Sequence, residues 1–259
     1  MSWFGKMLGG TIGLVIGGPL GAIAGGAIGH HLFDKAGVQH GGGQWANQMG
    51  RGPTPGTSPV EERQAAFFLA LFSILGKLAK ADGQITREEG ETVVSFLDQM
   101  GVQGKQRQFA IQVFNEAKDS PYSAEDFARQ FAQMSRMQPD LRSSMLDMLF
   151  QVALADGEYH PKEEEMIAAI AAILGIGKAQ LDAYHSRSVD TTDTAYAALG
   201  LSADADDETV RSTYRKLVHE YHPDRIISQG MPQECVEYAT QRFQEIQTAW
   251  DTIRKERNL

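Results

Sequence analysis

One stretch near the C-terminus strongly constrains the fold, because it joins an amphipathic helix to a sequence that must end it. The helix carries an apolar stripe and a basic stripe, each at helical spacing. The apolar stripe consists of Val210, Tyr214, Leu217 and Tyr221, and the basic stripe of Arg211, Arg215 and His219. Pro223 lacks a backbone N–H and disfavours helix in the residue before it, so the helix should end near His222. The tripeptide His222-Pro223-Asp224 would then be displayed on a loop at the end of a basic helix.

The sequence on both sides of this helix completes the pattern of a known module. Upstream, Tyr196 and the run Leu199-Gly200-Leu201 precede an acidic run, Asp204 to Glu208, which suits a helix start. Downstream lies a second long amphipathic stretch, whose apolar face consists of Phe243, Ile246, Trp250 and Ile253. In this order, residues 194–253 resemble the J-domain, the module by which Hsp40 co-chaperones activate Hsp70. The resemblance predicts a J-domain over residues 194–259, folded as a helical hairpin.

The J-domain resemblance implies a partner and a binding site. The tripeptide His222-Pro223-Asp224 would contact an Hsp70 of the DnaK type where its nucleotide-binding domain, substrate domain and linker meet. Basic side chains would steer and hold an acidic surface of that partner, and these are Arg211, Arg215, Lys216 and Arg225. From the residues alone, the same basic stripe also fits a solvated helix surface. The apolar and aromatic residues of the two helices are expected to pack together as a core.

The N-terminal region contains a span, Met7 to Gly29, without a charged residue. As a helix it would be about 34 Å long, enough for a bilayer core of roughly 30 Å. In water each interior glycine would cost about 1 kcal/mol relative to alanine, whereas lipid enforces the helix. The sequence therefore predicts a single transmembrane helix over residues 7–29, in contact with membrane lipid. A cleaved signal peptide and a glycine-rich hairpin on the membrane surface are the alternatives.

Glycines recur at every fourth position of this span and would form a smooth groove along one face. Another helix can approach such a groove closely, which predicts a homodimer through Gly9, Gly13, Gly17, Gly21 and Gly25. Residues 36–59 are rich in Gly, Pro, Gln and Ser and lack periodicity, so they are expected to form a flexible linker.

The middle of the chain, from about Val60 to Ser186, is helical in pattern with few strand signals, which predicts an all-α fold. Helices are expected at residues 105–118, 124–135 and 140–153. An internal repeat aligns residues 80–89 with residues 154–163, and each copy has a helix, an Ala-Asp-Gly turn and a second helix. This arrangement resembles the TerB-like all-helical domain of tellurite-resistance proteins, and it predicts a TerB-like bundle over residues 60–186.

The acidic turns of this repeat raise the question of metal binding. In an EF-hand loop the first and third positions need oxygen ligands, but Leu78 and Lys80 of the first copy offer no carboxylate. Capping explains the turns better, because Thr86 and Glu89 form a capping box. A weak Mg²⁺ or Ca²⁺ site stays as a secondary hypothesis, and its ligands would be Asp82, Glu89, Asp156 and Glu163.

Composition and motifs exclude several classes of function. A net charge of −9 predicts no general attraction to nucleic acid. The single cysteine, Cys235, excludes an intramolecular disulfide and a cysteine-based metal cluster. The sequence contains no nucleophile elbow and no His-Glu-x-x-His motif. We therefore expect a protein that is not an enzyme and needs no cofactor.

Taken together, the regions resemble the DjlA type of co-chaperone, which has one N-terminal membrane span, a TerB-like middle and a C-terminal J-domain. The resemblance implies a co-chaperone anchored in a bacterial inner membrane by a single pass, with its C-terminal domains facing the cytoplasm, where Hsp70 and ATP are found. The alternative is a membrane-stress sensor or scaffold that acts mainly through the TerB-like domain. Deletion of residues 60–186 would distinguish the two: the scaffold hypothesis predicts that only this loss abolishes the cellular phenotype, whereas His222→Gln has no effect.

Overall fold

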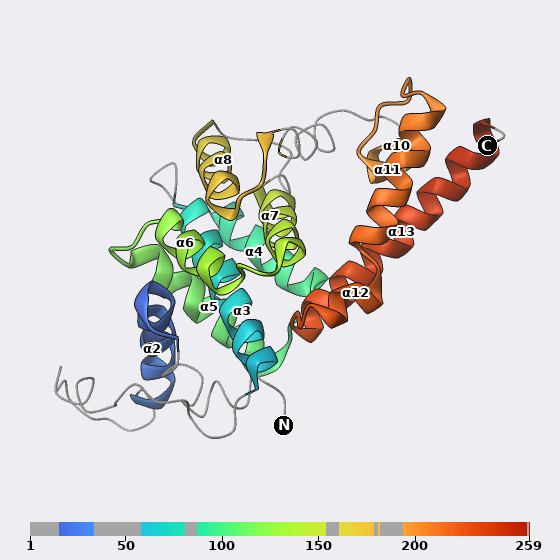
Figure 1. Ribbon diagram of the computed structural model, residues 1–259. Coiled ribbons are helices and arrows are strands. Elements are labelled where there is room, and N and C mark those ends of the chain that lie inside the picture. Colours follow the sequence, from blue (N-terminus) through green and yellow to red (C-terminus); the bar gives the residue numbers. More distant parts are fainter. Residues whose placement is uncertain are drawn as a thin grey trace.

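Two helical bodies make up the part of the protein that the structure describes (Figure 1). The computed structural model describes residues 16–33, 58–80, 87–153, 161–178, 181, 194–257 and 259. The first body, the bundle, consists of α2 (Gly18–Phe33), α3 (Pro59–Leu78), α4 (Arg87–Gln99), α5 (Gly104–Asp119), α6 (Ala124–Met134), α7 (Pro139–Ala153) and α8 (Pro161–Leu174). The second, the C-terminal unit, consists of α10 (Thr194–Leu199), α11 (Asp207–Glu220), α12 (Pro223–Ser228) and α13 (Gln233–Arg257).

The predicted all-α fold is confirmed over these residues, all of whose regular elements are helices. Helices α5, α6 and α7 coincide within a residue or so with those expected at residues 105–118, 124–135 and 140–153. The predicted linker falls outside the described residues up to residue 57, and α3 already begins at Pro59. The periodic placement of apolar residues was therefore enough to locate these helices.

Helix α3 forms the centre of the bundle and contacts α2, α5, α6 and α7. Nearly every residue from Ala65 to Leu78 is buried, because neighbours cover the helix on several sides. Phe67 meets Phe131 of α6 edge-on, with ring centroids 5.7 Å apart, and Phe68 stacks on Phe109 of α5 at 6.2 Å. Burial of this many large apolar side chains is the main stabilising term of the bundle.

Local sequence signals set where α3 begins and how closely it is packed. Ser58 and Glu61 form a capping box: the Glu61 N–H donates to Ser58 Oγ at 3.2 Å, and the Ser58 N–H donates to Glu61 Oε2 at 2.9 Å. Further along, a Cβ at Gly76 would collide with the carbonyl oxygen of Phe114 on α5. Only glycine allows the two backbones this approach.

Helix α2 packs on one side of the bundle, against α3, α5 and α6. It buries four apolar side chains there, namely Leu20, Ile23, Ala24 and Ala27. The Leu20 N–H donates to Gln130 Oε1 at 2.9 Å, and Gln130 Nε2 donates to the carbonyl oxygen of Gly17. Residues 7–15 of the predicted span lie outside the described residues. Among the helices that are described, none combines the length and the apolar character needed to cross a membrane.

The C-terminal unit is the helical hairpin that the sequence predicts, with α10 and α11 packed on α13. Leu217, Tyr221 and Ile246 are buried, as expected of core residues. Tyr214 and Trp250, also expected in the core, are half-buried and stack on each other with centroids 4.4 Å apart. The hairpin is therefore closed on its inner side and open on the outer side of α11.

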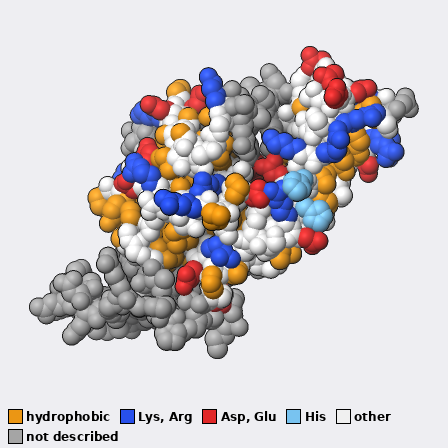
Figure 2. All heavy atoms as spheres, in the orientation of Figure 1, with side chains coloured by type: hydrophobic (Ala, Val, Ile, Leu, Met, Phe, Trp, Pro, Cys, Tyr) orange, Lys and Arg blue, Asp and Glu red, His pale blue; other side chains and the backbone are white. Residues whose placement is uncertain are grey.

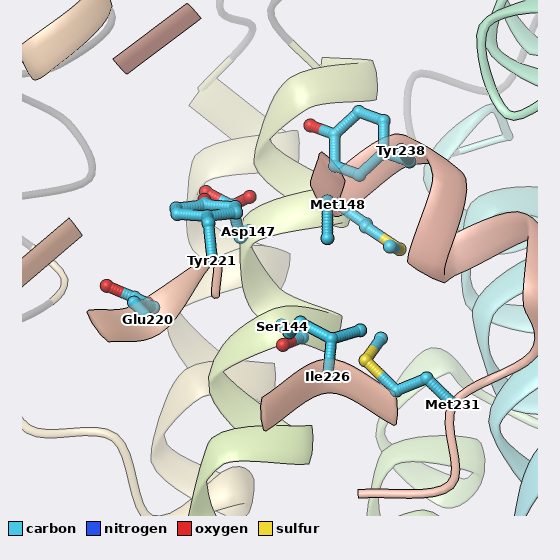
Figure 3. A pocket seen from close by; sticks show the side chains of 9 residues that line it. Ser144, Asp147, Met148, Glu220, Tyr221, Ile226, Met231 and Tyr238 are labelled. Atoms are coloured by element: carbon cyan, nitrogen blue, oxygen red, sulfur yellow. The ribbon is translucent and has the colours of Figure 1, made fainter. Parts of the chain in front are cut away.

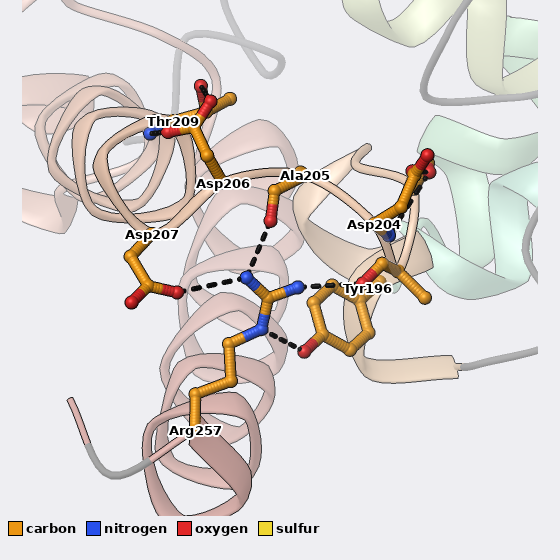
Figure 4. A network of polar contacts seen from close by, with 9 residues as sticks. Tyr196, Asp204, Ala205, Asp206, Asp207, Thr209 and Arg257 are labelled. Atoms are coloured by element: carbon orange, nitrogen blue, oxygen red, sulfur yellow. Dashed lines mark hydrogen bonds and ion pairs between the residues drawn. The ribbon is translucent and has the colours of Figure 1, made fainter.

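Arg257, near the C-terminal end of α13, ties the hairpin to the segment that leads into α11 (Figure 4). Its guanidinium donates to the Tyr196 hydroxyl at 2.6 Å and to the carbonyl oxygens of Ala205 at 2.5 Å and Ala203 at 2.7 Å. It also pairs with Asp207 at 3.1 Å. The hydrogen bond to Tyr196 and the pair with Asp207 raise the pKa of Arg257 further above its ordinary range. Arg257 thus fixes where α11 starts relative to α13.

Candidate functional site

The helix that carries the predicted site, α11, has clear boundaries at both ends. At its start Asp206 accepts a hydrogen bond from the Thr209 N–H at 2.8 Å, and this bond holds the pKa of Asp206 below its ordinary value. At its end the Tyr221 N–H donates to the carbonyl oxygen of Leu217 at 2.9 Å, and α11 ends at Glu220. The proline in the sequence therefore ends the helix close to where it was predicted to end.

The tripeptide forms a capped corner between α11 and α12. Pro223 opens α12, a position where its missing N–H costs nothing. His222 is the N-cap: its Nδ1 accepts a hydrogen bond from the Asp224 N–H at 3.3 Å. The His222 ring also meets Phe243 of α13 edge-on, with centroids 5.6 Å apart. The sequence predicted a loop here, but proline at the first position and a capping side chain before it instead favour a short helix.

The corner and the outer side of α11 are open to solvent. His222 and Asp224 are exposed, and so are the basic residues Arg211, Arg215 and Lys216. Figure 2 shows histidine side chains at the surface with lysine and arginine side chains beside them, near the junction of the two bodies. The exposed basic side chains of α11 can bind an acidic protein surface, and the imidazole and carboxylate of the corner are free to make hydrogen bonds to the same partner.

Arg225, the remaining basic residue predicted to contact a partner, points toward the bundle instead. Its Nε donates to Asp140 Oδ2 at 3.2 Å, and a second guanidinium nitrogen pairs with Asp140 Oδ1. It also donates to the carbonyl oxygen of His219 at 3.4 Å. Asp140 belongs to the first turn of α7, far away in sequence. Sequence reasoning missed this partner, because no local pattern links the two positions.

A small hollow lies between α7 of the bundle and the α11–α13 part of the C-terminal unit (Figure 3). It is lined by Ser144, Asp147, Met148, Glu220, Tyr221, Ile226, Met231, Tyr238 and Ala239. Asp147 of α7 is buried, with 5% of its surface exposed. Burial and the nearby Asp147 carboxylate both raise the pKa of Tyr238. The burial of Arg242 opposes its charge, but Tyr221, Tyr238 and Asp147 nevertheless raise its pKa above the ordinary range.

The other predicted site residues are only partly described. Asp82 and Asp156 lie outside the described residues, whereas Glu89 is on α4 and Glu163 on α8. Within the described ranges, no three His, Cys, Asp or Glu side chains gather in a way that could hold a metal ion.

Of the glycines predicted to form a self-association face, Gly9 and Gly13 lie outside the described residues, and a Cβ at Gly17 or Gly25 would meet no other atom within 4 Å. A Cβ at Gly21 would instead collide with the carbonyl oxygen of Ile16, and Gly17 lies before the start of α2, so the described glycines do not form one open helix face.

Three protein families have models that match this chain. The model of tellurite resistance protein TerB matches residues 68–185, and that of the DnaJ domain matches residues 194–258. The model of the co-chaperone DjlA transmembrane domain matches residues 1–50. Both resemblances seen in the sequence, to a J-domain and to a TerB-like domain, are therefore confirmed.

Curated proteins similar to the chain share its whole length. It is 34% identical to the co-chaperone protein DjlA of Aliivibrio fischeri and 35% identical to that of Shewanella oneidensis, in each case over 100% of both chains. It is 34% identical to the co-chaperone protein DjlA of Vibrio parahaemolyticus over 98% of both chains. No solved structure matches the chain.

Proposed function

The chain belongs to the family of the co-chaperone protein DjlA, and on that premise we propose that it stimulates the ATPase of a cytosolic Hsp70 of the DnaK type. The observation that carries the proposal is the exposed corner of His222 and Asp224 at the end of α11. The J-domain, α10–α13, acts as an activator and performs no catalysis of its own.

The mechanism is a shift in the population of Hsp70 states. The J-domain binds the arrangement of Hsp70 that hydrolyses ATP more tightly than the others, and this difference in affinity drives the shift. The N-cap bond from the Asp224 N–H to His222 holds the corner in a fixed shape before binding. Arg211, Arg215 and Lys216 mainly raise the rate of encounter with an acidic surface, an effect that salt weakens.

The membrane anchor is the second part of the proposal. The N-terminal segment crosses the bacterial inner membrane once, and the bundle and the J-domain face the cytoplasm, where Hsp70 has access to ATP. Support comes from the match of residues 1–50 to the DjlA transmembrane domain and from the absence of charge over residues 7–29. In this structure residues 18–29 belong to α2 and pack on the bundle, so a crossing over residues 7–29 requires α2 to leave the bundle for lipid. Anchoring would restrict Hsp70 activation to the membrane surface.

Steady-state ATPase of Hsp70, measured with the full chain in lipid nanodiscs, tests the main proposal. Wild-type protein should stimulate hydrolysis, and His222→Gln should abolish most of the stimulation because it removes the imidazole from the corner. His219→Gln is the matched control, since His219 is exposed on the same helix but lies outside the tripeptide. A wild-type chain without effect, or equal stimulation by both variants, would refute the proposal.

Self-association through the glycine face is the third part. A Cβ at Gly17 or Gly25 would have open space around it, so leucine there should block the approach of a second helix without disturbing the bundle. In a membrane two-hybrid assay, Gly17→Leu with Gly25→Leu should weaken the signal. Gly177→Leu, at an open position outside the predicted span, is the control. An unchanged signal in the double variant would exclude this interface.

A further inference from the structure

The J-domain has a second face, distinct from the open side of α11, that packs on the bundle. This face is made of α12 and the start of α13, and it meets α3, α4 and α7. The contact joins two regions that match different families, TerB and the DnaJ domain. Neither family match assigns a function to it.

Apolar and backbone contacts fit the two bodies together. Met231 is buried, and its carbonyl oxygen accepts a hydrogen bond from Gln64 Nε2 of α3 at 3.0 Å. Tyr238 of α13 meets Phe96 of α4 edge-on, with centroids 6.3 Å apart. At Gly230, which has a φ of +71°, a Cβ would lie 3.0 Å from a methyl group of Val60. The turn before α13 therefore lies directly on the start of α3.

Carboxylates on one side of α7 face arginines of the J-domain. Asp140 and Asp147 are two helical turns apart, so they lie on the same side of α7. Asp140 holds Arg225 through both guanidinium contacts, and Asp147 is buried beside Tyr238 and Arg242. A two-point contact between arginine and carboxylate is directional as well as attractive. The bundle thus presents an acidic face to the arginines of the J-domain.

We propose that this docking is an autoinhibitory contact, in which Asp140 of the bundle and the acidic surface of Hsp70 compete for Arg225. The inference rests on the proposed function, because Arg225 is one of the basic residues assigned to Hsp70 binding. While Arg225 is held by Asp140, Hsp70 meets a J-domain that lacks one of its cationic contacts. Binding of Hsp70 must either break the pair or do without Arg225.

The docked state leaves the rest of the binding surface open, which limits the size of the effect. His222, Asp224, Arg211, Arg215 and Lys216 are all exposed while Arg225 is paired. The side chains of Arg225 and Asp140 are themselves 25% and 43% exposed, so water screens their attraction. Release of Arg225 should therefore change the affinity for Hsp70 and leave the maximal ATPase rate unchanged.

The test is Asp140→Asn in the full chain in lipid nanodiscs, which breaks the pair without touching the J-domain. The concentration that gives half-maximal stimulation of Hsp70 should fall about two- to fivefold, the range for a partly exposed ion pair. Asp98→Asn is the matched control, because it breaks the pair with Arg107 inside the bundle and should leave that concentration unchanged. The difference between Asp140→Asn and wild type should shrink as salt rises.

A measurement without Hsp70 separates this inference from the proposed function. Hydrogen exchange of the full chain should show faster exchange in α12 for Asp140→Asn than for wild type or Asp98→Asn. Unchanged exchange, or an unchanged half-maximal concentration while His222→Gln still abolishes stimulation, would overturn the autoinhibitory contact. If the wild-type chain does not stimulate Hsp70, the proposed function is refuted. The exchange rate of α12 would still show whether Asp140 holds the J-domain on the bundle.

Discussion

Helix α3 of the bundle is apolar on all sides from Ala65 to Gly76, whereas helix α11 of the J-domain carries a single apolar stripe, and the two helices are used in opposite ways. Neighbours cover α3 so fully that nearly every residue from Ala65 to Leu78 is buried. On α11 the buried residues are only Val210 and Leu217, and the basic side chains remain in solvent. Helix α3 therefore holds the bundle together, whereas α11 keeps only a minimal core, so that its outer side stays available for a partner.

The largest expected effect comes from truncating a buried aromatic side chain of α3. Phe67 has no exposed surface, and Phe67→Ala should destabilise the bundle by about 3–5 kcal/mol because it leaves a cavity against Phe131. Hydrogen exchange of the full chain should then accelerate in α3 and α6 but not in α11. Met137→Ala, at a side chain that is 91% exposed, is the control and should change stability by less than about 0.5 kcal/mol.

Equal acceleration of exchange in α3 and α11 after Phe67→Ala would contradict separate roles for the two helices. It would mean that the two bodies unfold as one cooperative unit, held together by the docked face of the J-domain. Acceleration confined to the bundle would instead show that the hairpin is stable without it.

A smaller effect is expected from removing Arg257, whose polar contacts hold the start of α11 in place, whereas apolar packing holds α3. Arg257→Ala removes the bonds to Tyr196 and to the carbonyl oxygens of Ala203 and Ala205, and leaves these groups without that donor. Exchange should accelerate at the start of α11 and in α10, with α3 unchanged. Lys255→Ala, an exposed position on the same helix, should have no such effect. If both variants behave alike, the polar contacts of Arg257 do not position α11.

The contrast between the two helices also explains what the sequence could predict. Periodicity located α5, α6 and α7, and Pro223 located the end of α11, because these signals act within a few residues. The order of motifs identified the J-domain and the TerB-like domain, which the family matches confirm. Local physics and recognisable motifs were therefore sufficient to place these helices and to identify the two domains.

The contacts between distant parts of the chain could not be predicted in the same way. Arg225 was assigned to the partner surface with the other basic residues, yet its own ion pair is with Asp140. A carboxylate on one helix and an arginine on another carry no signal of their pairing, because any exposed acid would serve equally well. The packing of Leu20 and Ile23 against the bundle was missed for the same reason, since the apolar character of that segment fits lipid as well as protein.

The smallest expected effect concerns capping carboxylates, which occur at helix starts in both bodies. Asp206 at the start of α11 and Asp126 at the start of α6 both have a pKa lowered first by a backbone hydrogen bond, from Thr209 and from Ser123 respectively. A carboxyl group whose folded pKa lies below its unfolded value of about 3.9 contributes stability above that value. That contribution is lost as the pH falls from about 4 through the folded pKa.

Asparagine keeps a side-chain oxygen that can accept the backbone hydrogen bond, but it does not titrate in this range. The substitution therefore removes the pH dependence of the cap and keeps its hydrogen bond. In hydrogen exchange of the full chain between about pH 5 and pH 3, expressed as protection factors to remove the intrinsic pH dependence, wild-type α11 should lose protection as the pH falls. Asp206→Asn should make the protection of α11 nearly independent of pH and leave α6 unchanged. Asp126→Asn should do the reverse, because each cap acts within the first turn of its own helix. If Asp206→Asn leaves the pH dependence of α11 intact, then another titrating group controls the start of this helix, and the open side of α11 is held in place by the rest of the hairpin rather than by its cap.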